Sequence, residues 1–297
     1  MLVSMKEILE HANKNSYAVA APNVVTELDT RAFIEAAEEL NAPLILDFAY
    51  GMHPDIHFLG KICTMLAEQS SVPIAVNFDH GADKKYILEA IQSGFTSVMV
   101  DRSSLPFEDN VREVKEIVDI AHNIGISVEA ELGHVGQANN YENDRNAALT
   151  SVEEAKEFVK RTDVDCLAVA IGTAHGAYPK GFKPEIDFKR LKEIKDALPD
   201  LPLVLHGSSG TDLDSLRKVC SMGINKVNIA NDVCRGAVDG LKNADLEGSG
   251  AYDVYRAARE GAKKVLMEMI EVYGSVNKAF DVKPKGLCTG MTSMEEK

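Results

Sequence analysis

Three of the eight histidines in the chain are each preceded by a run of small or branched apolar residues and followed by glycine. They are His80 in "PIAVNFDHG", His175 in "LAVAIGTAHG" and His206 in "PLVLHGSSG". Three neutral imidazoles around one ion, with an open fourth position, form a catalytic zinc site. Glycine after each histidine permits a sharp turn and a close approach of the backbone. The pattern therefore predicts a zinc site built from His80, His175 and His206.

A simpler explanation exists for any one of these histidines, because a histidine at a strand end commonly makes only a structural hydrogen bond. The same local context occurs three times in this chain, and this repetition favours the metal site. Asp79 directly precedes His80 and adds a carboxylate that can exchange a proton with a substrate. The chemistry that these residues suggest is metal-assisted acid–base catalysis.

Eight short apolar runs lie along the chain, and the segments between them carry apolar residues three or four positions apart. The runs occupy residues 18–25, 42–49, 73–80, 97–103, 127–134, 166–173, 202–209 and 226–233. Nearly continuous apolar strands indicate a parallel sheet that is covered on both faces. Eight strand–helix units predict a closed (β/α)8 TIM barrel. An open doubly wound sheet is the main alternative, but no GxGxxG turn follows the first run.

In a barrel of this kind the carboxyl ends of the strands carry the chemistry. Polar and ionisable residues stand at the ends of the predicted strands in this chain. They are Asn23, Asp79, His80, Asp101, Glu131, His175, His206 and Asn228. We expect these side chains to converge at one rim of the barrel.

The predicted barrel occupies residues 1–280 as a single domain and ends in a long amphipathic helix over residues 252–273. This helix is a candidate subunit contact. Residues 281–297 are expected to form an irregular tail.

The formal net charge of −14 argues against a nucleic-acid partner, although a local positive field can still accept a phosphorylated substrate. The N-terminal segment lacks the apolar core of a signal peptide, and no apolar run approaches the roughly 18 residues of a membrane span. The five cysteines form no CxxC pair, which indicates reduced thiols. These features predict a cytoplasmic protein without a membrane partner.

Six motifs, taken in order, resemble the zinc-dependent class II fructose-bisphosphate/tagatose-bisphosphate aldolases. The motifs are "NFDHG", "GFTSVMVDRSSLPFEDN", "SVEAELGHVG", "LAVAIGTAHGAY", "PLVLHGSSG" and "INKVNIANDV". The resemblance extends over roughly residues 3–275 and so covers nearly the whole chain.

The resemblance implies that His80, His175 and His206 bind the catalytic zinc. Asp79 would be the acid/base that acts on the C4 hydroxyl of the sugar. Asp101 and Glu131 would be the carboxylates near the zinc, where they orient its ligands or hold a second cation.

The resemblance also implies a binding site for the substrate and its phosphate, together with a potassium or sodium ion near the phosphate. The residues expected there are Asn23, Gly176, Gly207, Ser208, Ser209, Gly210, Asn228, Ala230 and Asn231. Most of them follow the seventh and eighth strands, where TIM barrels commonly bind phosphate.

One departure from the family pattern concerns the loop after "ELGHVG", which in the family contains adjacent acidic residues that handle a substrate proton. Asn139 and Asn140 occupy that place here, and asparagine cannot accept and return a proton at neutral pH. Glu142 is our candidate for this catalytic role, with Asp144 as the alternative. Ordinary solvated loop charge is the competing explanation for both.

Other departures alter the residues around the expected substrate. Arg102 replaces the usual glycine after Asp101, and it is expected either to contact an anionic substrate or to form a salt bridge. Ser208 replaces a glycine. Ala230 replaces the acidic residue of fructose-type enzymes, as in the tagatose-type branch, and Asn231 replaces a threonine.

The leading functional hypothesis is an aldolase that cleaves a ketose phosphate or bisphosphate at C3–C4 into dihydroxyacetone phosphate and an aldehyde, through a zinc-stabilised enediolate. A sugar-phosphate epimerase or isomerase with the same chemistry is one alternative, and a non-catalytic sugar-phosphate-binding paralogue is another. The chemistry requires no Schiff-base lysine, so Lys226 is expected to pack its stem or to support the phosphate charge. The family implies a homodimer or homotetramer.

Overall fold

Eight parallel strands form one sheet in the order β1-β8-β7-β6-β5-β4-β3-β2 in the computed structural model, which describes residues 1–49, 51–136, 149–176, 184–245, 247–248 and 250–282. The strands are β1 Val19–Pro22, β2 Leu44–Ala49, β3 Ile74–Gly81, β4 Ser97–Val100, β5 Ser127–Leu132, β6 Cys166–Val169, β7 Leu203–Leu205 and β8 Ile224–Ile229. A parallel bridge between Asn23 and Asp47 joins the end of β1 to β2 and closes the cylinder. The predicted (β/α)8 barrel is therefore confirmed.

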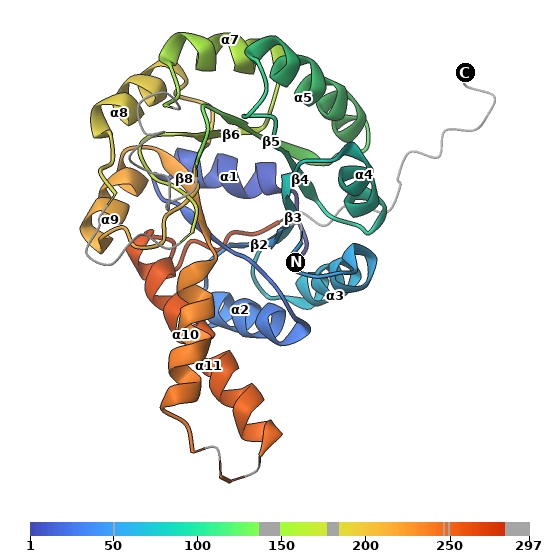
Figure 1. Ribbon diagram of the computed structural model, residues 1–297, viewed down its shortest axis with the longest axis vertical. Coiled ribbons are helices and arrows are strands. Elements are labelled where there is room, and N and C mark those ends of the chain that lie inside the picture. Colours follow the sequence, from blue (N-terminus) through green and yellow to red (C-terminus); the bar gives the residue numbers. More distant parts are fainter. Residues whose placement is uncertain (50, 137–148, 177–183, 246, 249, 283–297) are drawn as a thin grey trace, which may run out of the picture.

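Helices from α2 onward surround the cylinder in chain order, whereas α1 lies across its centre in the view of Figure 1. The helices are α1 Met5–Lys14, α2 Glu27–Glu39, α3 Ile56–Gln69, α4 Lys84–Gln92, α5 Phe107–His122, α7 Val152–Thr162, α8 Phe188–Ala197, α9 Leu213–Ser221, α10 Asn231–Lys242 and α11 Ala251–Val272. Side chains cap several of their first turns. Ser151, for example, accepts a hydrogen bond from the backbone N–H of Glu154.

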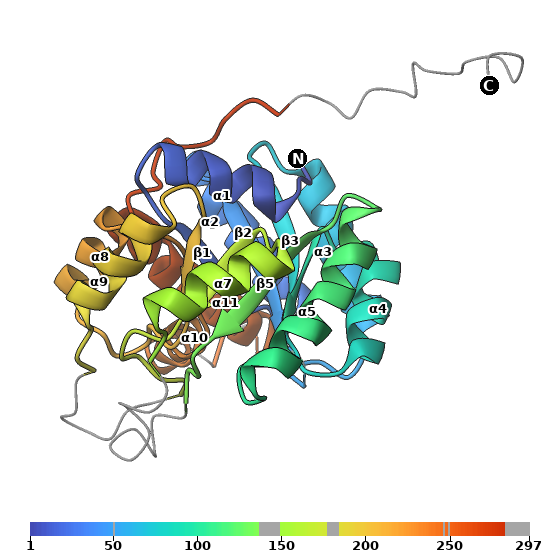
Figure 2. The same cartoon turned by 90° about the horizontal axis from the view of Figure 1, so that it is seen from above.

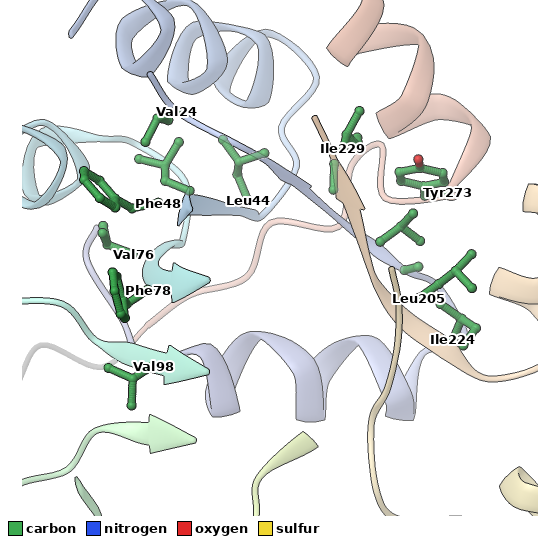
Figure 3. Packing of buried hydrophobic residues seen from close by; sticks show 14 of the residues in the cluster. Val24, Leu44, Phe48, Val76, Phe78, Val98, Leu205, Ile224, Ile229 and Tyr273 are labelled. Atoms are coloured by element: carbon green, nitrogen blue, oxygen red, sulfur yellow. The ribbon is translucent and has the colours of Figure 1, made fainter. Parts of the chain in front are cut away.

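Two apolar layers hold the barrel together. Residues that point outward from the strands, such as Val76, Phe78 and Val98, pack under the surrounding helices (Figure 3). Residues that point inward near the strand starts, such as Ile45 and Ala75, pack against the apolar face of α1. Helix α1 consequently closes one end of the barrel (Figure 2), and this leaves the opposite end, where the strands finish, for the polar residues.

The observed strands lie within or next to the eight predicted runs but are shorter at several carboxyl ends. Strand β6 stops at Val169, and β7 covers only Leu203–Leu205. Gly172 and Gly207, which follow these strands, have positive φ values of 107° and 66° that a strand does not contain. His175 and His206 therefore lie in the turns beyond β6 and β7.

Helices α10 and α11 form a hairpin that projects from one side of the barrel (Figure 1). A Cβ atom on Gly240 would come within 2.2 Å of the carbonyl oxygen of Ala257, so the two helices pack with almost no space between their backbones. The predicted C-terminal helix is confirmed within one residue at each end. In the described part of the chain, no helix has the length and apolar character needed to cross a bilayer. Most of the predicted irregular tail, residues 283–297, lies outside the described residues.

Candidate metal centre

Strand β3 contains an irregularity that places two consecutive side chains, Asp79 and His80, at the barrel mouth, which is the end of the barrel where the strands finish. Phe78 pairs with Val98 and Gly81 with Val100, so β3 carries one extra residue against β4. His80 takes up the extra length in a left-handed conformation with φ of 51°. In a regular strand Asp79 and His80 would point to opposite faces. The bulge lets both reach the other polar residues of the mouth.

The three predicted histidines meet at this mouth. Nε2 of His80 lies 3.2 Å from Nδ1 of His206. The ring centroid of His80 is 4.7 Å from that of His175 and 4.8 Å from that of His206. His80, Glu131, His175 and His206 each offer one ligand atom, and these atoms all lie within 4.8 Å of one another. Such a group could hold a metal ion.

Two buried polar atoms in this group support that interpretation. Nε2 of His175 and Oε2 of Glu131 have no hydrogen-bond partner among the residues that the structure describes. An unpaired buried acceptor is costly, so such atoms call for a ligand. Imidazole nitrogen together with carboxylate oxygen is a donor set that suits zinc. The residues present therefore fit a bound divalent ion.

Carboxylates hold the far sides of two imidazoles. Nδ1 of His80 donates to Oδ2 of Asp101 at 2.9 Å, and Nε2 of His206 donates to Oε1 of Glu129 at 2.8 Å. These hydrogen bonds leave the opposite nitrogen of each ring facing the centre of the group. Contacts of this kind fix the tautomer and orientation of metal-binding histidines. Asp101 thus lies behind His80 and is not one of the four clustered donors.

A buried ionic network lies below His206 inside the barrel. Nζ of Lys226 is 2.8 Å from Oε2 of Glu129 and 3.2 Å from Oδ2 of Asp47, and all three side chains are fully buried. Nδ2 of Asn77 donates to the other oxygen of Asp47 at 2.8 Å. The expectation that Lys226 supports phosphate charge is therefore wrong, because its charge is paired within the barrel interior.

Glu129, Asp47 and Asn77 are functional residues that we did not predict from the sequence. The available signal was a charged or amide side chain within an otherwise apolar strand. Buried charges of this kind are almost always paired, so they mark partners inside the barrel. Which strands supply the partners becomes evident only from the barrel order.

Asp79 is held by two amides. Nδ2 of Asn23 donates to Oδ2 of Asp79 at 3.0 Å, and Nδ2 of Asn228 donates to Oδ1 at 3.1 Å. Burial favours the neutral acid, but nearby His80, His206 and Lys226 outweigh it and hold the pKa of Asp79 well below its usual range. Asp79 is consequently an oriented, ionised carboxylate. Asn23 and Asn228, which we expected to contact substrate, contact Asp79 in this structure.

The pKa values of the other ionisable groups at the barrel mouth are shifted in opposite directions. Burial and the charge of Asp101 raise the pKa of Glu131 to about 8. Burial lowers the pKa of His80, but Asp79 and Asp101 more than compensate and raise it to about 10. Burial, followed by His206 and His80, lowers the pKa of His175 to about 3, so this ring is neutral. The pKa values of Asp79 and Asp101 are lowered, so both carboxylates are ionised beside the histidines, and their negative charge favours a positive ion.

The residues expected to bind phosphate lie in the turn after β7 and at the start of α10. Gly207 and Gly210 have φ values of 66° and 84°, and Asn231 is the first residue of α10. The hydroxyl of buried Ser208 donates to the backbone oxygen of Asn228 at 2.7 Å, which ties the turn to β8. Backbone N–H groups at a helix start favour anions.

The remaining predicted residues flank these groups or lie outside the described residues. Gly176 follows His175 with φ of 92° and is exposed, and Ala230 is the residue that precedes α10. Arg102 is buried, and it forms a salt bridge with Glu113, one of the two alternatives considered. Glu142, like Asn139, Asn140 and Asp144, lies outside the described residues.

Known proteins match the chain over nearly its whole length. The family model described as "Fructose-bisphosphate aldolase class-II" matches residues 3–278. A fructose-bisphosphate aldolase of Thermus caldophilus is 38% identical over an alignment of 307 positions, gaps included, that covers 94% of this chain and 100% of that protein.

Solved structures agree with these sequence matches. The YdjI aldolase from Escherichia coli K12 has a TM-score of 0.84 and 33% identity, covering 94% of this chain and 100% of that one. A putative fructose-1,6-biphosphate aldolase from Coccidioides immitis has a TM-score of 0.81 and 26% identity, covering 92% of this chain and 97% of that one. The resemblance seen in the sequence motifs is thereby confirmed. The chain belongs to the class II fructose-bisphosphate aldolase family and is an aldolase, an enzyme that cleaves or joins a carbon–carbon bond.

Proposed function

We propose that this aldolase is zinc-dependent and that it reversibly cleaves a phosphorylated ketose between C3 and C4, giving dihydroxyacetone phosphate and an aldehyde. The observation that carries the proposal is the convergence of His80, His175, His206 and Glu131 within 4.8 Å of one another. When bound there, zinc supplies a Lewis acid that polarises the ketose carbonyl and balances the negative charge formed during cleavage.

Asp79 is the proposed general base. Its carboxylate is ionised and is oriented by Asn23 and Asn228, so it is ready to accept the proton of the C4 hydroxyl. Loss of that proton lets the C4 oxygen form the aldehyde carbonyl while the C3–C4 electron pair passes to the ketose half. That half must then gain a proton at C3, and Glu142 is our candidate donor. In the synthetic direction the same groups act in reverse.

The phosphate of the substrate is proposed to bind between the turn after β7 and the start of α10. We expect backbone N–H groups of Gly207, Ser209, Gly210 and Asn231 to bind it, because Asn231 begins α10 and an anion there also benefits from the helix dipole. The hydroxyl of Ser208 is already used on the oxygen of Asn228, so we expect Ser208 to contribute through its backbone. A potassium or sodium ion is proposed beside the phosphate.

Metal analysis combined with a substrate panel tests this function. We expect about one zinc per chain, loss of activity with a chelator and recovery on adding zinc. The panel contains fructose and tagatose bisphosphates and ketose monophosphates, with release of triose phosphate as the readout. Purified active protein without stoichiometric metal contradicts the proposed centre. Isomerised sugar without triose phosphate contradicts the proposed cleavage.

The proposed assembly is a homodimer or homotetramer that uses the α10–α11 hairpin. Tyr252 and Tyr255 on α11 are 70% and 58% exposed, and Val238 on α10 is 47% exposed. Exposed aromatic residues on a projecting element are typical of protein contacts. Light scattering after size-exclusion chromatography measures the assembly, and a monomer at micromolar concentration contradicts this proposal.

A further inference from the structure

The backbone at His80 is in a conformation that needs support. A non-glycine residue in the left-handed region costs about 1–2 kcal/mol. His80 has φ of 51°, and the bulge around it interrupts the ladder between β3 and β4. Unpaired backbone groups at such an irregularity must find other partners. The carbonyl of Gly81, directly after His80 at the end of β3, has a side-chain partner.

Arg102 supplies that partner from the end of β4. Its Nη1 donates to the carbonyl oxygen of Gly81 at 2.9 Å and to the carbonyl oxygen of Asp101 at 2.8 Å. Its Nε donates to Oε2 of Glu113 on α5 at 2.5 Å. Only 8% of Arg102 is exposed, and its contact with the carbonyl of Gly81 is buried.

The two carbonyls belong to the two backbone segments that carry His80 and Asp101, whose side chains are hydrogen-bonded to each other. Gly81 follows His80, and Asp101 carries the carboxylate that accepts from Nδ1 of His80 at 2.9 Å. Nη1 of Arg102 therefore links these two segments through their backbones, in parallel with the side-chain hydrogen bond. The clamp restrains the distance across which this hydrogen bond forms.

We propose that Arg102 is a positioning residue that holds His80 and Asp101 in register and so presets Nε2 of His80 for the metal ion. The inference rests on the proposed metal centre. It assigns to Arg102 a role beyond its ion pair with Glu113, because Nη1 makes contacts that the pair alone does not need. A lysine ammonium is a single point donor and cannot reproduce the planar fork that reaches Glu113 and both carbonyls.

The test measures metal binding directly. Zinc affinity is determined by competition with a chromophoric chelator for the full-length protein and for Arg102→Ala and Arg102→Lys. The visible spectrum of each cobalt-loaded protein reports the coordination geometry. We expect both substitutions to weaken zinc binding by about 10- to 100-fold, as for other residues that orient metal ligands, and to change the cobalt bands.

Arg112→Ala is the matched control. Arg112 also pairs with Glu113, at 3.5 Å, but its side chain is 66% exposed. Its loss is expected to leave zinc affinity and the cobalt spectrum unchanged. An equal loss of affinity in Arg112→Ala assigns the effect to Glu113 and overturns the proposal.

Circular dichroism of the metal-free proteins verifies folding, and Arg102→Lys decides the matter if Arg102→Ala does not fold. Folded Arg102 variants with unaltered zinc affinity and cobalt spectra contradict the clamp while leaving the proposed function intact. Absence of zinc binding by the unsubstituted protein contradicts the proposed function itself.

Discussion

Oε1 of Glu129 lies 2.8 Å from Nε2 of His206, and both side chains are completely buried inside the barrel. The other oxygen of Glu129 is 2.8 Å from Nζ of Lys226. A buried carboxylate is tolerated because it has these two partners. Burial favours the neutral acid, but Lys226 and His206 outweigh it and lower the pKa of Glu129, so the carboxylate is ionised and orients the imidazole. The position of His206 thus depends on Lys226, which acts through Glu129.

Lys226→Met is expected to destabilise the protein by about 3–5 kcal/mol, because it leaves Glu129 and Asp47 buried without their cation. Urea unfolding of the metal-free protein measures this loss. Lys192→Met is the control. The side chain of Lys192 is 66% exposed and forms an ion pair with Asp196 on the surface. Loss of this pair should change the free energy of unfolding by less than about 1 kcal/mol. Similar effects of the two substitutions argue against an energetic role for the buried network.

Asp79→Asn is expected to lower kcat by about 100- to 10,000-fold, because an amide cannot accept the proton of the C4 hydroxyl. Zinc content should be retained, since Asp79 is not one of the four clustered donors. Asp83→Asn serves as the control: Asp83 caps α4 through a hydrogen bond from Lys85, and asparagine is an equally good cap. Cleavage by Asp79→Asn at the normal rate removes Asp79 from the mechanism.

The stability of the metal-free protein should depend on pH through the ionisation of Glu131. Its pKa in the folded protein is about 8, against an ordinary value of 4.5. Above the ordinary value the unfolded chain releases the proton that the folded chain retains, so the contribution of Glu131 to stability declines up to the folded pKa. Glu131→Gln should therefore gain stability relative to the unsubstituted protein as the pH rises from about 5 to about 8, by at least about 1.4 kcal/mol, the equivalent of one pKa unit.

Urea unfolding at several pH values measures this difference without metal. Glu193→Gln makes the same chemical change at a side chain that is 51% exposed on α8, and its stability curve should run parallel to that of the unsubstituted protein. A parallel curve for Glu131→Gln as well would falsify the assigned shift in pKa.

Gly207→Ala should destabilise the protein more than Gly125→Ala. Both glycines have positive φ, 66° and 74°, so an added Cβ strains the backbone by about 1–2 kcal/mol at either position. At Gly207 the new atom would also lie 2.4 Å from the carbonyl oxygen of Ala174, whereas at Gly125 nothing lies within 4 Å. The difference in unfolding free energy between the two variants therefore measures the clash with Ala174 alone. We expect this difference to exceed about 1 kcal/mol.

Zinc affinity of Gly207→Ala gives a second readout, because Gly207 and Ala174 adjoin His206 and His175. Affinity should fall in Gly207→Ala and remain unchanged in Gly125→Ala. Equal stability and equal affinity in the two variants would mean that the turn adjusts without moving the histidines.

The barrel and the meeting of three histidines were predictable from the sequence. Apolar runs that alternate with helical patterns leave few ways to cover both faces of each strand. A closed barrel covers both faces of all eight strands. In that architecture every strand ends at the same rim, so His80, His175 and His206 must approach one another. The shorter ends of β6 and β7 did not affect this outcome, since the turns that follow them remain at the rim.

Tertiary structure alone decided how individual side chains point and pair. A strand alternates its faces, so only the observed bulge explains why Asp79 and His80 both reach the mouth. The sequence left two alternatives for Arg102, an anionic substrate or a salt bridge, and its direction toward Glu113 depends on the packing of α5 against the barrel. The pairing of Lys226 with Glu129 and Asp47 joins three distant strands, and it follows from their inward register around the cylinder, which no local pattern encodes.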